Sequence, residues 1–136
     1  MALISLAGAD VMNSLANTLL LGQPTPQVRE QAEAWVRKAL AVIAAAKDQS
    51  KAEPDEAAHC DLVLAAALFN HGSLREMAGD LDNARKLFLD SRRQSSQLNL
   101  REGVIQADMA VRRVDRLNRA KESRTSTPVG IATDNK

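Results

Sequence analysis

Residues 69–91 read FNHGSLREMAGDLDNARKLFLDS, and this stretch decides the fold. A run with helical spacing ends at Gly79, a residue type that readily adopts the left-handed conformation found just after many helices. Asp80 follows at once as an N-cap residue, and a new apolar rhythm begins behind it. Two helices joined by so short a turn lie antiparallel. The stretch therefore predicts a helical hairpin whose turn is at Gly79 and Asp80.

The second helix of this hairpin carries a small residue, a bulky residue and another small residue in steps of four and three. The same steps occur twice in the chain, at Ala84, Phe88 and Ser91 and again at Ala32, Val36 and Ala39. Small residues let a neighbouring helix come close, and the bulky residue fills the space between the helices. Gly72, seven residues before Gly79, supplies a small residue on the first helix. These spacings predict an internal repeat.

This pattern resembles the tetratricopeptide repeat (TPR), a helical pair with a small residue in its first helix, glycine at the turn, then alanine, a large apolar residue and another small residue. The matching residues are Gly72, Gly79, Asp80, Ala84, Phe88 and Ser91. The segment LNLREGVIQADMA (98–110) is also similar to the linker and next first helix of a longer variant of the repeat. The resemblance covers residues 65–117 well and 9–46 loosely. Arg75 stands where the family has tyrosine, and His71 where it has leucine.

The resemblance implies a right-handed superhelix of antiparallel helix pairs, with about two repeats and a C-terminal capping helix. The TPR-like helical domain is expected over residues 1–122, with pairs at about 3–47 and 55–97 and the capping helix at about 100–122. Residues 123–136 lack periodicity and are expected to form a disordered tail. Composition independently favours an all-α fold, because the chain has 23 alanines, no tyrosine and no stretch that alternates like a strand. A plain five-helix bundle around one central core is the alternative architecture.

In a TPR-like array the first helices of successive pairs line a concave surface. Carrying that register onto this sequence places Asn13 and Asn17 on the concave face together with Asp10 and Ser14, which form one polar stripe at helical spacing. Later first helices contribute Phe69, Asn70, Ser73 and Met77, and then Gln106, Met109, Arg113 and Arg116. Exposed apolar side chains among amides suit an extended or helical peptide. The alternative is that Phe69 and Met77 only pack against a neighbouring helix.

The N-terminal stretch MALISLAGADVMNSLANTLLLG (1–22) is the most apolar part of the chain. It has no basic start, and polar residues interrupt it on one helical stripe, which favours a largely buried globular helix over a signal peptide or a membrane span. Such a helix needs neighbours. The chain could therefore self-associate through it, or dock through it as a structural subunit or fragment of a larger assembly.

Residues with catalytic or metal-binding chemistry are few. His59, Cys60 and His71 are too few for a zinc site, and Cys60 lies about 16 Å along one helix from His71 at the helical rise, too far for a catalytic pair. Phosphate-binding glycine loops and nucleophile motifs are absent from the sequence. No enzyme activity, metal or cofactor is therefore predicted. The lone cysteine excludes an internal disulfide and favours an intracellular location, cytoplasmic or mitochondrial.

Charge gives no strong field, since 18 basic residues face 17 acidic ones. Basic residues do gather in the last helix and tail, but no aromatic residues interleave with them to stack bases. A solvated end of the array explains them better than nucleic acid. The sequence thus predicts a non-catalytic scaffold that binds a protein or peptide partner on its concave face, and a nucleic-acid-associated module is the less favoured alternative.

Overall fold

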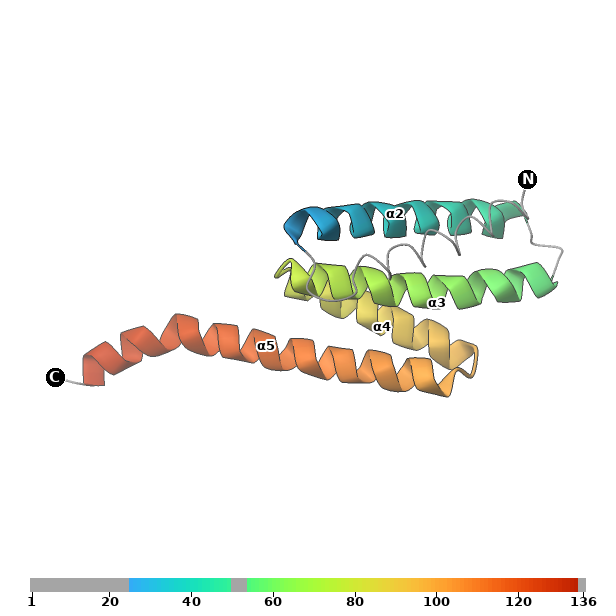
Figure 1. Ribbon diagram of the computed structural model, residues 1–136. Helices are drawn as coiled ribbons and strands as arrows, with labels where there is room; N and C mark the ends of the chain where they lie inside the picture. Colours follow the sequence, from blue (N-terminus) through green and yellow to red (C-terminus); the bar gives the residue numbers. More distant parts are fainter. Residues whose placement is uncertain (1–24, 50–53, 135–136) are drawn as a thin grey trace.

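The computed structural model describes residues 25–49 and 54–134, and all regular structure in these ranges is helical, which confirms the all-α class. Four helices follow one another across the molecule (Figure 1): α2 (Pro26–Gln49), α3 (Pro54–Met77), α4 (Leu81–Gln97) and α5 (Arg101–Asp134). The predicted helix at 3–21, with Asn13 and Asn17, lies outside the described residues.

Helix α2 begins at Thr25 and Pro26, a cap residue followed by proline, which is a typical helix start in sequence. The hydroxyl of Thr25 accepts a hydrogen bond from the backbone N–H of Val28 at 3.2 Å, and its carbonyl accepts one from Arg29 at 2.9 Å. Pro26 is the first helical residue, where its missing N–H costs nothing because the first N–H groups of a helix have no intrahelical partner. These local signals fix the start of the helix without help from distant packing.

The turn between α3 and α4 lies at Gly79 and Asp80, as the sequence predicts. Gly79 has a φ of +83° and donates its N–H to the carbonyl of Glu76 at 3.0 Å, while Asp80 donates its N–H to Arg75 at 2.9 Å. These two bonds are the Schellman arrangement that ends a helix with one left-handed residue. The Asp80 side chain then accepts from the backbone N–H of Asn83, so the same residue caps α4.

The turn between α4 and α5 repeats this geometry without a glycine. Asn99 has a φ of 59°, and it donates its N–H to Ser96 at 3.1 Å while Leu100 donates to Ser95 at 2.9 Å. Asparagine is one of the few residues that tolerates the left-handed region. Asparagine is also a residue type that often caps the start of a helix. In the structure Asn99 ends α4, and Leu100 accepts the first helical hydrogen bond of α5, from Val104.

Helix α5 is longer than the sequence predicts. We expected it to end near residue 122 with a disordered tail at 123–136, but it continues to Asp134. Over residues 101–124, where burial is described, the last buried residue of α5 is Val114. Propagation of a helix that has formed gains one hydrogen bond for each fixed residue, except at Pro128, which has no N–H to donate.

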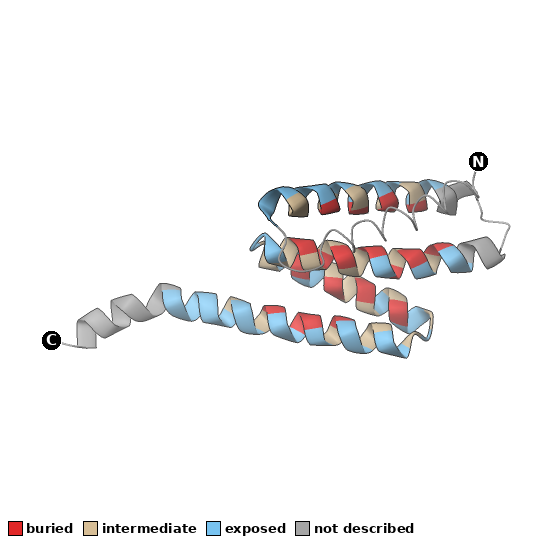
Figure 2. Cartoon of the chain, viewed as in Figure 1, coloured by how far each residue is buried: buried red, intermediate tan, exposed pale blue. Residues whose placement is uncertain are grey.

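Among the described residues each helix packs against its neighbours in the chain. Helix α2 contacts α3, α3 contacts α4, α4 contacts α5, and α3 also touches α5. Figure 2 shows the buried residues on the facing sides of the helices. Between α2 and α3 the core holds Ala32, Val36 and Leu74 in one cluster and Ala39, Ile43, Val63 and Ala67 in another. Between α4 and α5 it holds Ala84, Phe88, Ala110, Val111 and Val114.

The predicted small and bulky residues are all at close helix contacts. Ala32, Ala39, Ala84 and Phe88 have no exposed surface, and Ser91 is buried. A Cβ atom at Gly72 would come within 2.8 Å of Cε1 of Phe88, so the glycine makes room for that ring. The Ser91 hydroxyl donates to the carbonyl of Ala65 at 2.9 Å, which ties α4 to α3. The spacing pattern thus marks where α3 and α4 approach each other most closely.

Candidate functional site

A groove of about 280 Å³ lies among α3, α4 and α5. Its lining carries no charged side chain and comes from ten residues: Leu62, Ala65, Ala66, Phe69, Asn70, Ser91, Ser95, Leu100, Gly103 and Gln106. We call it the α3–α5 groove. Apolar side chains with a few amides and hydroxyls are the usual lining of a binding site that takes a neutral, mostly apolar group.

Three of the predicted concave-face residues line this groove, namely Phe69, Asn70 and Gln106. Phe69 is half-buried, and its ring centroid lies 5.2 Å from that of Phe88 at an interplanar angle of 58°. Asn70 is only 8% exposed. Both residues therefore contribute to the packing of α3 as well as to the groove wall.

The remaining predicted contacts lie outside the groove lining. Met77 and Met109 are 42% and 56% exposed, as expected of residues available to a partner. Ser73 donates its hydroxyl to the carbonyl of Phe69 one turn earlier, at 3.2 Å. Its side chain is therefore used within α3.

Arg113 has an intramolecular carboxylate partner. Its Nε and Nη2 both donate to Glu76 at 2.7 Å, which joins α5 to α3, and its guanidinium lies 6.0 Å from the centroid of the Phe88 ring. The hydrogen bonds from Arg113 to Glu76 raise the pKa of the guanidinium. A bidentate pair of this kind fixes both side chains. Arg113 thus holds the two walls of the groove in register.

The repeat register does not predict the close contact of α4 with α5 at Ser95 and Gly103, which line the α3–α5 groove. A Cβ atom at Gly103 would lie 2.5 Å from the Ser95 hydroxyl, so α4 and α5 meet there as closely as α3 and α4 do at Gly72. Ser95 follows Ser91 by four residues, one helical turn, and is 2% exposed. A glycine on one helix matched with a small or bulky residue on the neighbouring helix is the signal that could have found this contact.

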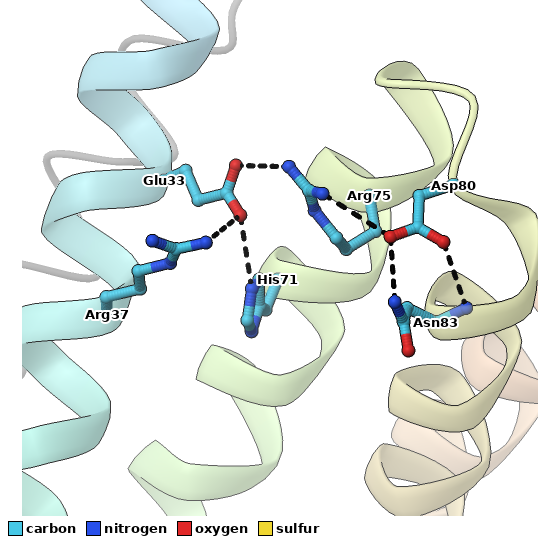
Figure 3. A network of polar contacts seen from close by, with 6 residues as sticks. All are labelled: Glu33, Arg37, His71, Arg75, Asp80 and Asn83. Atoms are coloured by element: carbon cyan, nitrogen blue, oxygen red, sulfur yellow. Dashed lines mark hydrogen bonds and ion pairs between the residues drawn. The ribbon is translucent and has the colours of Figure 1, made fainter.

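A second polar cluster joins α2 to α3, as Figure 3 shows. The carboxylate of Glu33 accepts hydrogen bonds from Arg75 at 2.6 Å and from Arg37 at 3.2 Å, and lies 3.4 Å from Nε2 of His71. Burial alone would raise the pKa of Glu33, but the hydrogen bond and charge of Arg75, with the charges of Arg37 and His71, outweigh it and lower the pKa. Burial lowers the pKa of His71 against the opposing effect of Glu33.

The same cluster extends to the turn before α4. Nη1 of Arg75 lies 3.4 Å from Asp80, and the Asn83 side chain donates to Asp80 at 2.8 Å. These bonds, that from Asn83 first, lower the pKa of Asp80. His71 and Arg75 are the two residues that depart from the TPR pattern, and both contact Glu33. These two side chains therefore share one partner on α2.

Comparison with known proteins gives no relative for this chain. No family model matches it, and no curated protein or solved structure matches it significantly. Within the part of the chain that the structure describes, no helix is long and apolar enough to cross a membrane, and no group of three or more His, Cys, Asp or Glu side chains is placed to hold a metal ion.

Proposed function

We propose that this chain is a TPR-like, non-catalytic interaction module that binds a peptide or a protein segment in the α3–α5 groove. The observation that carries the proposal is the groove itself, which brings Phe69, Asn70 and Gln106 together around an uncharged space of about 280 Å³. A space of this size accommodates one or two large apolar side chains of a ligand, and the amides can bond its backbone.

The order of helix contacts supports the TPR-like part of the proposal. In a solenoid each helix pair touches only its neighbours, and α2 through α5 pack in chain order. The close approaches at Gly72 and Ser91 fall on the residues of the repeat pattern. With α3 and α5 as successive first helices, the groove between them corresponds to the concave face. We propose a non-catalytic role because the sequence has no catalytic motif.

A charge placed in the groove tests the proposal. Ala66 is exposed and lines the groove, whereas Ala34 is exposed on α2 and lies outside it. Peptides selected from a random displayed library against the whole chain should lose at least about tenfold in affinity for Ala66→Glu, because the carboxylate would be desolvated by the ligand. Ala34→Glu should bind them as the unmodified chain does.

Ala66→Glu is a better test than the double substitution Phe69→Ala/Asn70→Ala, because the double substitution also removes packing within the protein. Phe69 contacts Phe88 and Asn70 is buried, so a loss of binding in that variant would mix unfolding with loss of contact. Peptides that bind Ala66→Glu and the unmodified chain equally, with both proteins folded by circular dichroism, would remove this groove from consideration.

A further inference from the structure

A second groove runs along α4 and α5 and takes no lining residue from α3. Hollows of about 530 Å³ and 320 Å³ share Ser96 and Val104, so they form one continuous surface, which we call the α4–α5 groove. Its apolar lining consists of Leu89, Leu100, Val104 and Ile105. Ile105 is 43% exposed, and the other three are half-buried. The groove therefore offers apolar contact area to another molecule.

All charged residues in the lining of this groove are arginines: Arg92, Arg93 and Arg101. Arg92 donates to Asp108 at 2.8 Å, so its charge is compensated. The Arg93 side chain is 70% exposed and lies 3.4 Å from Asp90, a weak contact within one helix. Arg101 is exposed, and none of the described carboxylates forms an ion pair with it. Two cations are thus available beside the apolar floor.

We propose that the α4–α5 groove docks an acidic amphipathic helix of a partner protein. Two antiparallel helices form a channel into which the apolar ridge of a third helix packs. Its apolar side chains would cover Leu89, Val104 and Ile105, and its carboxylates would meet Arg93 and Arg101. Nucleic acid fits less well, because the floor is aliphatic and no aromatic residue in the lining could stack a base.

Titration with a synthetic helix tests this proposal on the whole chain. The probe is a fluorescent peptide of about 15 residues with leucines at helical spacing and glutamates on both flanks, and its counterpart carries lysine in place of each glutamate. The glutamate peptide should bind, and its affinity should fall as salt rises. The lysine peptide should bind at least about tenfold more weakly.

Charge reversal in the protein supplies the matched comparison. Arg93→Glu/Arg101→Glu should weaken binding of the glutamate peptide at least about tenfold and improve binding of the lysine peptide. Arg119→Glu reverses an exposed arginine of α5 that lies outside both grooves, so it should change affinity by no more than about twofold. Ile105→Asp tests the apolar floor and should also abolish binding of the glutamate peptide.

Three results would overturn the proposal. The first is that the glutamate and lysine peptides bind equally. The second is that Arg93→Glu/Arg101→Glu and Arg119→Glu change the affinity equally. The third is that single-stranded RNA binds through Arg93 and Arg101 while the glutamate peptide does not bind. Thermal unfolding of each variant verifies that it is folded. Ala66→Glu should retain binding of the glutamate peptide, so failure at this groove and failure at the α3–α5 groove are distinguishable.

Discussion

Gly72 and Gly79 belong to the same repeat pattern but are glycines for different physical reasons. At Gly72 a Cβ atom would lie 2.8 Å from Phe88, inside van der Waals contact, although the backbone there is ordinary helix. At Gly79 nothing lies within 4 Å of a Cβ atom, but φ is +83°. The first position therefore requires space and the second requires conformational freedom.

This difference predicts that the cost of alanine depends on the Phe88 side chain at Gly72 but not at Gly79. Gly72→Ala should gain up to about 1 kcal/mol of helix propensity but lose about 1–3 kcal/mol through overpacking against Phe88, a net destabilisation. When Phe88 is first shortened to leucine, Cε1, the ring atom closest to the added Cβ, is removed, so the overpacking should lessen and Gly72→Ala should cost less. Urea unfolding of the four proteins in this double-mutant cycle measures the coupling.

Gly79→Ala is the control for that cycle. It should cost about 1–2 kcal/mol because alanine is strained at positive φ, and the cost should be the same with Phe88 or Leu at position 88. If Phe88→Leu relieved both glycine substitutions equally, or neither, the steric explanation of Gly72 would be wrong.

At the scale of the helices, boundaries with local signals were predictable. Helix α4 begins directly after the predicted turn and ends at Gln97, the predicted end of the second pair. Thr25, Gly79 and Asp80 set these boundaries and the start of α2 through bonds within a few residues. The end of α5 was not predictable in this way, since the helix continues through Pro128 and Gly130, residue types that usually end a helix.

The candidate site was predictable only in part. The repeat register placed Phe69, Asn70 and Gln106 at one groove. It could not foresee that Arg113 pairs with Glu76, or that His71 and Arg75 share Glu33, because such partners are far apart in sequence and are chosen by packing. Helical periodicity assigns a residue to a face, but it does not tell which charge lies opposite.

Glu33 is the carboxylate that the polar cluster between α2 and α3 shares, and its removal should weaken the packing of these two helices. Glu33→Gln should destabilise the protein by about 1–2 kcal/mol at low salt, because Arg75 loses the anion at 2.6 Å in a half-buried place. The loss should shrink as salt rises. Glu30→Gln, an exposed position on the same helix, should stay within about 0.5 kcal/mol. Equal effects at both positions, measured by chemical unfolding, would contradict this role for Glu33.

His71 makes the stability of the same contact depend on pH. Its pKa in the folded protein lies below the ordinary 6.5, chiefly because of burial, so the unfolded chain binds the proton more readily. Its contribution is therefore complete above pH 6.5 and is lost as the pH falls through the folded pKa.

The non-titrating variant His71→Gln should accordingly show a shallower loss of stability between about pH 7.5 and 5.5 than the unmodified chain. Below that range Glu33 takes over in both proteins, since its lowered pKa makes its contribution fade only as the pH falls below 4.5. Parallel curves of unfolding free energy for the two proteins above pH 5.5 would contradict this prediction. They would show that the pKa of His71 is the same in the folded and unfolded states.

At the scale of the whole molecule, the helices differ in how many neighbours support them. Among the described residues α2 packs against α3 alone, whereas α4 lies between α3 and α5 and contacts both. Figure 2 shows buried residues on α4 where it contacts its two neighbours. When each helix contacts only the helices next to it, the helix at one end can open while the other helices stay packed. Protection of backbone amides should therefore be uneven along the chain.

Hydrogen exchange measures this directly. Amides of α4 should exchange only through global unfolding, and amides of α2 through a cheaper opening that separates α2 from α3. Ile43→Val, which thins the contact of α2 with Val63 and Ala67, should cost about 1 kcal/mol and speed exchange in α2. In conditions where partial opening dominates, exchange in α4 should not change. If the substitution sped exchange equally in α2 and α4, the four helices would unfold as one cooperative unit, because only a shared core transmits a local loss to every helix at once.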